Sequence, residues 1–206
     1  LINDYGCTRE AATNYVLANF PGAAAWDAGG RVDGNWDDAV KVKDAPDAVY
    51  NFSASGGNAT ENFRLSLGHR KTMGTSIGVE YESISGSLDY KKKAGKVDIV
   101  TSVRVSNAIQ EGQLEGSSYF AAPQMTRIFM SPYQQIYNAD GSLNTNLSTS
   151  VFNTVYLAEN NISKLDGTRA LSNTSLSYKI TDNLKFLTRY SLDYNLTNSH
   201  RYQNAV

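Results

Sequence analysis

The chain has 206 residues, of which 41% are apolar, 19% charged and 11% aromatic, and its formal net charge at pH 7 is −1. The near-neutral charge lacks the positive excess typical of a nucleic-acid-binding protein, and no apolar run approaches the ~18 residues of a membrane-spanning helix. The 13 Tyr, 7 Phe and 2 Trp supply more aromatic surface than a disordered chain carries, so part of this single-domain length is buried.

Residues 1–47 are predicted to form a loop region with one short helix. Apolar side chains recur at helical spacing between Arg9 and Phe20, and Thr8 is placed to cap the first turn. Pro21 and Gly22 end the pattern. This is the one segment of the chain whose period favours a helix.

From Tyr50 onward the dominant hydrophobic period is two, which places alternate side chains on opposite faces of a strand. Residues 48–196 contain six such segments and predict antiparallel strands. The apolar positions share one face of these segments and are expected to face lipid if the strands belong to a membrane barrel. They include Phe63, Leu65, Leu67, Ile99, Val103, Leu176, Phe186 and Leu192.

The connections between these segments alternate in length. They are short at 56–60, 91–96 and 181–183, longer at 70–83, and very long at 107–173. Up-and-down outer-membrane barrels have short periplasmic turns and longer extracellular loops. The long segment is therefore predicted to be an extracellular loop, and residues 197–206 the start of the next one, whereas a compact soluble domain rarely contains so long a connection.

The polarity of the two predicted faces favours a membrane barrel over a soluble sandwich. The polar positions are mostly Ser, Asn and Asp with scattered Arg, which suits a water-filled lumen. The apolar faces end in aromatic residues, as in the girdles of outer-membrane barrels: Tyr50, Tyr81, Tyr90, Tyr178 and Tyr194. Aromatic side chains that fill the core of a β-sandwich remain the alternative.

Six strands are too few to close a barrel, because the smallest closed barrels have about eight strands and an open edge is unfavourable in lipid. Either residues 1–47 and 107–173 contain further strands, or the sequence is part of a larger barrel. Neither region shows sustained alternation, so the second interpretation is favoured.

Five short motifs, in this order and spacing, resemble the SusC/RagA family of TonB-dependent outer-membrane transporters. The resemblance covers residues 35–196. The motifs are NWDDAV (Asn35–Val40), YNFSASGG (Tyr50–Gly57), FRLSLGH (Phe63–His69), IYNADGS (Ile136–Ser142) and LSYKITDNLKFLTRYSLDY (Leu176–Tyr194).

This resemblance implies an all-β fold, in which the chain is an internal segment of an antiparallel transmembrane barrel of about 22 strands. It further implies a location in the outer membrane of a Gram-negative bacterium, in contact with outer-membrane lipid. The function implied is import of oligosaccharides or peptides beneath a SusD-like surface lipoprotein, driven by TonB through a plug domain that this sequence does not contain. No enzyme activity, cofactor, metal or nucleic-acid partner is expected. Two alternatives are a scaffold subunit of a larger outer-membrane machine and a soluble carbohydrate-binding β-sandwich.

Aromatic residues of the long loop are the candidates for contact with substrate or with the lipoprotein lid, because their rings can stack on a ligand. These are Tyr119, Phe120, Tyr133 and Tyr137.

Three other patterns are interpreted as loops. Gly74–Gly78 spells GxSxG, but the strand-like sequence that follows does not fit a nucleophile elbow, which a helix must follow. Asp33, Asn35, Asp37 and Asp44 have calcium-loop spacing but lack the glycine and the bidentate glutamate. The lysines at 91–93 are expected in a solvated turn.

Overall fold

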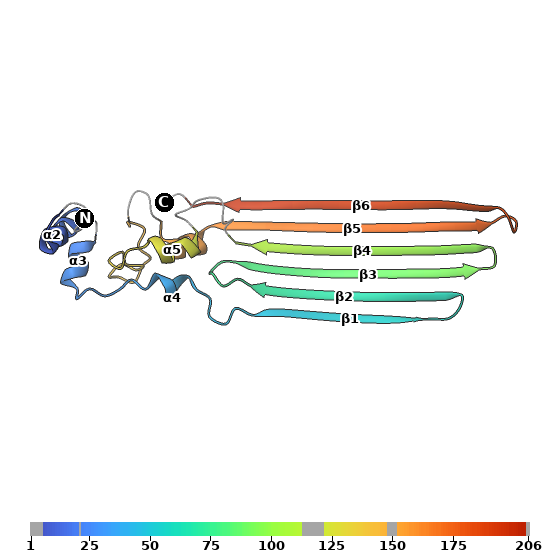
Figure 1. The fold of residues 1–206 in the computed structure, drawn as a ribbon, viewed down its shortest axis with the longest axis horizontal. Coiled ribbons are helices and arrows are strands. Elements are labelled where there is room, and N and C mark those ends of the chain that lie inside the picture. The colour runs from blue at the N-terminus through green and yellow to red at the C-terminus, as the bar shows by residue number, and fades with distance from the viewer. Residues whose placement is uncertain (1–5, 21, 113–121, 148–151, 205–206) are drawn as a thin grey trace.

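The computed structural model describes residues 6–20, 22–112, 122–147 and 152–204, and its main element is one antiparallel sheet of six strands in chain order (Figure 1). Each strand pairs with the next without a break in register. The strands are β1 (Asp47–Gly57), β2 (Glu61–Met73), β3 (Glu80–Ala94), β4 (Val97–Glu111), β5 (Ile162–Lys179) and β6 (Lys185–Tyr202). The sheet is open between β1 and β6, so the predicted up-and-down barrel segment is confirmed.

Within the described ranges, five short helices lie outside the sheet. They are α2 (Arg9–Asn19), α3 (Ala23–Ala28), α4 (Trp36–Val40), α5 (Pro123–Phe129) and α6 (Thr154–Asn160). The helix α2 matches the prediction, and the hydroxyl of Thr8 accepts a 3.2 Å hydrogen bond from the Ala11 amide as its N-cap. The other four helices were not predicted, because each has 5 to 7 residues and shows too little of a helical period. Among the described residues, no helix has the length and apolar character needed to cross a membrane.

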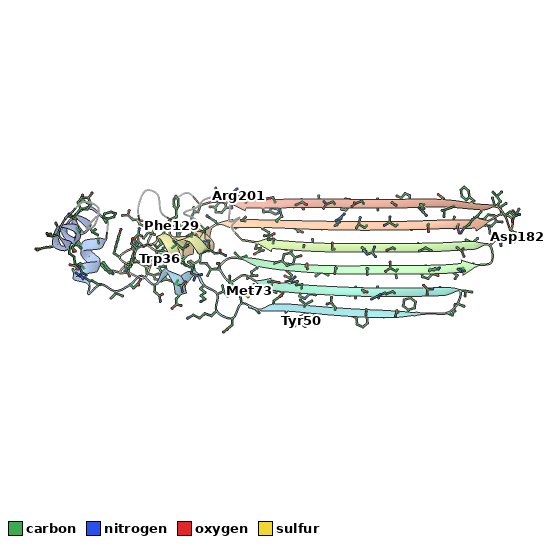
Figure 2. The ribbon with its side chains drawn as sticks, in the orientation of Figure 1. Trp36, Tyr50, Met73, Phe129, Asp182 and Arg201 are labelled. Carbon is green, nitrogen blue, oxygen red and sulfur yellow. The ribbon has the colours of Figure 1, made fainter. Side chains whose placement is uncertain are left out.

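All helices lie at one end of the sheet and the tight turns lie at the other (Figure 1). Figure 2 shows this separation through Trp36 and Asp182, which lie at opposite ends of the sheet. The turn end contains residues 58–60, 95–96 and 180–184, and the helix end contains residues 74–79 and the β4–β5 connection. The short connections therefore lie at one end of the sheet and the longer connections at the other.

Several predicted boundaries were wrong. The strand β4 continues to Glu111 and β5 begins at Ile162, so the predicted loop 107–173 shrinks to residues 112–161. Similarly, β6 extends to Tyr202 through residues predicted to start a loop. The apolar alternation does not extend to these strand ends, because they carry polar residues whose side chains form hydrogen bonds with one another across neighbouring strands. The Asn107 amide, for example, donates to Asp166 at 2.7 Å and to Thr168 at 3.0 Å.

The lysines at 91–93 were also misplaced. They lie in β3, where they pair with Val100, Ile99 and Asp98 of β4. The turn consists of Gly95 and Lys96, and the φ of +60° at Gly95 explains the glycine there.

The buried apolar side chains of the described residues all lie outside the sheet. They are Ala23, Trp36, Val40, Ala122, Ile136, Leu147, Val155 and Leu157. The strands form a single layer, and many large apolar side chains on it are exposed. A β-sandwich needs a second sheet packed on the first, so the described residues do not support that alternative.

Candidate functional site

The helix end of the sheet carries a small core of its own, which we call the loop cap. It is built from α4, α5, α6 and residues 130–147. Trp36 and Val40 pack there with Ile136, Leu147 and Val155. Two motifs of the predicted family resemblance, NWDDAV and IYNADGS, therefore meet in one core through Trp36 and Ile136. This core holds residues 133–147 in a defined position.

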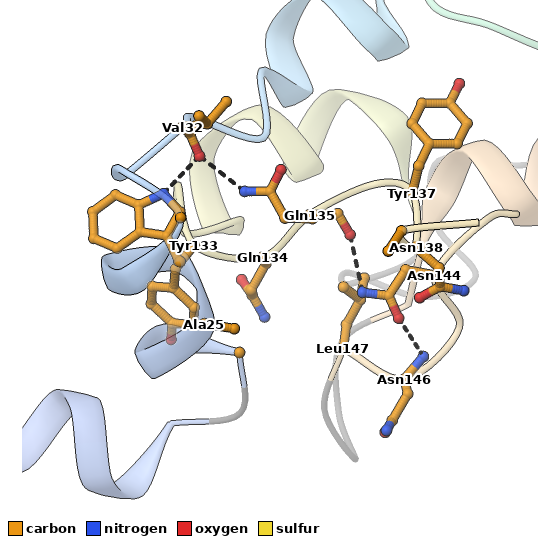
Figure 3. Close-up of a pocket in the computed structure, with 14 residues that line it drawn as sticks. Ala25, Val32, Tyr133, Gln134, Gln135, Tyr137, Asn138, Asn144, Asn146 and Leu147 are labelled. Carbon is orange, nitrogen blue, oxygen red and sulfur yellow. Dashed lines mark hydrogen bonds between the residues drawn. The ribbon is translucent and has the colours of Figure 1, made fainter. Parts of the chain in front are cut away.

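A hollow of about 430 Å³, which we call the loop pocket, lies between α3 and residues 133–147 (Figure 3). Its walls combine aromatic rings with carboxamides. The residues that matter for binding are Trp26, Tyr133, Gln134, Tyr137, Asn138 and Asn146. No Asp, Glu, His, Lys, Arg or Cys is among the described lining residues, so the lining carries no charged side chain at neutral pH.

A shared backbone carbonyl fixes two walls of the loop pocket. The Val32 carbonyl accepts hydrogen bonds from the Trp26 indole at 2.6 Å and from the Gln135 side chain at 2.9 Å (Figure 3). The Tyr133 ring lies edge-on to Trp26 with a centroid separation of 6.4 Å, and edge-on to Phe20 at 6.2 Å. Such aromatic pairs stabilise one another beyond their buried area. The rings are thus positioned before any ligand binds.

Several polar groups of the loop pocket have no partner among the described residues. The hydroxyls of Tyr133 and Tyr137 and the side-chain amide of Asn146 make no hydrogen bond there, and Tyr137 is 55% exposed. The Gln134 side chain uses its oxygen to accept from the Ser131 amide at 2.8 Å, which leaves its NH₂ group available. Stacking rings with free amides and hydroxyls can bind a neutral peptide backbone or a sugar. The arrangement suits binding of a neutral polar ligand.

The structure places two of the four predicted contact residues, Tyr133 and Tyr137, on the loop pocket. Tyr119 and Phe120 lie outside the described residues, and contact of any of the four with a ligand stays a prediction. Trp26 was missed. Its signal in the sequence was an aromatic residue in a small-residue segment bounded by Gly22 and Gly29, the two glycines that also line the loop pocket.

The GxSxG sequence lies in a loop, and several acidic side chains of residues 33–44 bond to other residues of the protein. Residues 74–79 connect β2 to β3, so no helix follows the GxSxG sequence. In the acidic loop, Asp33 accepts from the Asn35 amide at 2.9 Å and Asp37 forms an ion pair with Arg127. The Asn35 side chain and then the charge of Lys43 lower the pKa of Asp38 below its ordinary value.

The sheet register assigns every strand residue to one of two faces, because directly paired residues share a face. The eight positions predicted to face lipid share one face, which we call the apolar face; contact of this face with lipid stays a prediction. The eight are Phe63, Leu65, Leu67, Ile99, Val103, Leu176, Phe186 and Leu192. Tyr50, Tyr90, Tyr178 and Tyr194 lie on it too. Tyr81 was misassigned, since it pairs with Thr72 and Gln110 on the opposite, polar face.

Solved structures similar to this chain are transporter chains. One is described as the RagAB peptide transporter, with a TM-score of 0.69 and 16% identity over 95% of this chain and 24% of that one. Another is the RagAB peptide importer in a closed-closed state, with a TM-score of 0.65 and 16% identity over 96% of this chain and 23% of that one. The chain thus spans about a quarter of the length of these proteins and shares their fold over that part. No family model and no curated protein matches the sequence.

Proposed function

We propose that this chain forms part of the wall and the extracellular loops of a SusC-like TonB-dependent transporter in a bacterial outer membrane. The observation that carries the proposal is the open sheet whose apolar side chains share one face, joined to loops gathered at one end. The likeness in fold to the RagAB chains supports it and favours peptides over oligosaccharides as the cargo.

The extent of the apolar face agrees with a lipid-exposed band. On β6 it runs from Phe186 to Leu196 and is followed by Asn198 and His200. Ten residue steps span about 33 Å along a strand. A strand tilt of ~40° reduces this to about 25 Å across the membrane, which is the height of the apolar band on outer-membrane barrels. We therefore propose that the apolar face contacts lipid.

The polar face then lines the lumen, and the helix end is the extracellular end. In this orientation the loop pocket faces the medium, where it binds incoming cargo or packs under a SusD-like lipoprotein. The tight turns at 58–60, 95–96 and 180–184 face the periplasm. TonB acts through a plug domain elsewhere in the transporter.

An uptake assay in cells that express the full-length protein tests this function. Residues 112–161 are replaced by a short Asn-Gly turn, which keeps the β4–β5 hairpin but removes α5, α6 and residues 130–147 from the loop cap. We expect normal outer-membrane levels and loss of uptake of a neutral decapeptide of alternating alanine and glutamine. Unchanged uptake would contradict a role of these loops in cargo capture. A scaffold subunit would instead lose its protein partners while wild-type cells show no peptide uptake.

A further inference from the structure

The charges of the strands divide unequally between the two faces of the sheet. Every arginine of the strands lies on the polar face, and every glutamate lies on the apolar face. The polar face carries the cations Arg64, Arg70, Lys91, Lys93, Arg104, Arg169, Lys179, Lys185, Arg189 and Arg201 against the anions Asp47, Asp89, Asp98 and Asp193. This surface is strongly basic although the whole chain has a net charge of −1.

Three arginines cluster at the centre of the polar face, around a hollow of about 580 Å³. Arg64, Arg104 and Arg169 line it from β2, β4 and β5. Arg104 pairs in register with Leu171, two positions from Arg169 on the same face, so these two arginines are diagonal neighbours. Such neighbours lie about 7 to 8 Å apart. The spacing suits successive carboxylates of an extended chain.

The central arginines are only weakly neutralised by the protein. Arg104 approaches Asp89 at 3.8 Å and Arg169 approaches Asp193 at 3.5 Å, and both arginine side chains remain more than half exposed. Arg64 makes no ion pair with any described residue, although Asp89 faces it in the register. By contrast, Arg70 near the helix end is held by both oxygens of Asp47.

The space between the central arginines suits a polar chain. Ser53, Ser66, Ser85, Ser87 and Ser106 line the same hollow, and a side chain at Gly68 would collide with the hydroxyl of Ser85. Hydroxyls donate to or accept from a peptide backbone, and guanidinium groups bind carboxylates through charge-assisted hydrogen bonds.

From these observations we infer that the central arginines Arg64, Arg104 and Arg169 form a binding track for the carboxylates of acidic peptides. The inference rests on the proposed transport function and adds a preference for negatively charged cargo. Charge complementarity carries it: the track is cationic, partly unpaired and exposed, whereas the loop pocket is neutral.

The test compares two decapeptides in the uptake assay, one alternating alanine with glutamate and one alternating alanine with glutamine. In the full-length protein, Arg64→Gln, Arg104→Gln and Arg169→Gln are combined. We expect uptake of the acidic peptide at limiting concentration to fall about tenfold, with uptake of the neutral peptide unchanged. The matched control combines Lys71→Gln, Lys92→Gln and Lys164→Gln, which removes the same charge from the apolar face and leaves both peptides unaffected.

Equal loss of both peptides, or no loss of either, in the arginine variant overturns the inference while leaving the transport function intact. Failure of wild-type cells to import either peptide overturns the function, and the inference with it. A salt series on the wild-type protein tests the track without a variant. The distance over which charges attract one another shortens as ionic strength rises. Uptake of the acidic peptide, relative to uptake of the neutral peptide, must therefore fall between 50 and 500 mM salt. A constant ratio of the two uptake rates contradicts the binding track.

Discussion

The indole of Trp36 and the backbone carbonyl of Gln134 lie 98 positions apart in the chain and form a buried hydrogen bond of 2.7 Å. The bond joins the segment before β1 to the β4–β5 connection. Because both residues are buried, loss of the donor leaves a carbonyl without a partner. This one contact ties the wall of the loop pocket at Gln134 to the core of the loop cap.

Replacing Trp36 with phenylalanine should therefore loosen the loop cap. Trp36→Phe removes the donor and part of the buried ring, at a cost of about 2 to 4 kcal/mol. Native-state hydrogen exchange of the Asn144 and Leu157 amides, which donate to the Ile136 and Asn153 carbonyls, measures the opening free energy. Tyr15→Leu on α2, whose ring is exposed, is the control and should change the opening by less than about 0.5 kcal/mol. Equal opening free energies in Trp36→Phe and Tyr15→Leu would show that the hydrogen bond between Trp36 and Gln134 does not stabilise the loop cap.

Gly34 is predicted to be intolerant of a side chain for a related reason. A Cβ there would lie 2.6 Å from the Gln134 carbonyl and 3.2 Å from the Trp36 indole nitrogen. Gly34→Ala should destabilise the loop cap by about 1 to 3 kcal/mol through this overpacking. Gly167→Ala in β5 is the control, since its nearest neighbour would be 3.8 Å away. Thermal unfolding of the two variants separates steric collision from a general effect of glycine replacement.

The sequence predicted the strands better than the site. Period-two alternation located all six strands because their central residues sort cleanly into apolar and polar positions. It failed at the strand ends, where polar residues such as Asn107 and Asp166, which hydrogen-bond to each other, interrupt the apolar alternation. The loop pocket depends on contacts such as Trp26 with Tyr133, which join distant segments through short helices. The hydrophobic period of a single segment cannot indicate a contact between two segments that are distant in the sequence.

The IYNADGS loop should respond to acid through Asp140. Its carboxylate accepts hydrogen bonds from the Ser142 hydroxyl at 2.7 Å and the Ser142 amide at 3.0 Å, which lower the pKa of Asp140 below the ordinary 3.8. A lowered pKa gives stability that is present above the unfolded-state pKa and is lost as pH falls through the folded-state value. At neutral pH, Asp140→Asn should reproduce that loss and reduce exchange protection of the Asn138 amide, which donates to the Ser142 carbonyl. Identical protection in both proteins at neutral pH would exclude this role.

Tyr133 should contribute directly to cargo capture if the loop pocket binds peptide. Tyr133→Leu removes the free hydroxyl and the ring contacts with Trp26 and Phe20. We expect the Kd of the neutral decapeptide for the purified full-length protein to rise about tenfold. Tyr133→Phe keeps the ring and should show an intermediate effect, whereas Tyr15→Leu should show none. An unchanged Kd in Tyr133→Leu would mean that cargo binds elsewhere.

The lipid exposure of the apolar face is best tested at two adjacent residues of β6. Leu192 lies on the apolar face and is 47% exposed, and its neighbour Ser191 lies on the polar face between Arg189 and Asp193. Arginine near the middle of a lipid-facing strand costs about 2 to 4 kcal/mol, whereas a position facing the lumen tolerates the charge.

Leu192→Arg in the full-length protein should therefore reduce the folded, heat-modifiable fraction in the outer membrane, and Ser191→Arg should leave it near the wild-type level. The two variants add the same charge one residue apart, so any difference between them reports the face and not the charge. The opposite result would assign the apolar face to the inside of the barrel. Equal yields would argue that neither face meets lipid, because only a hydrocarbon environment penalises one of the two arginines so strongly.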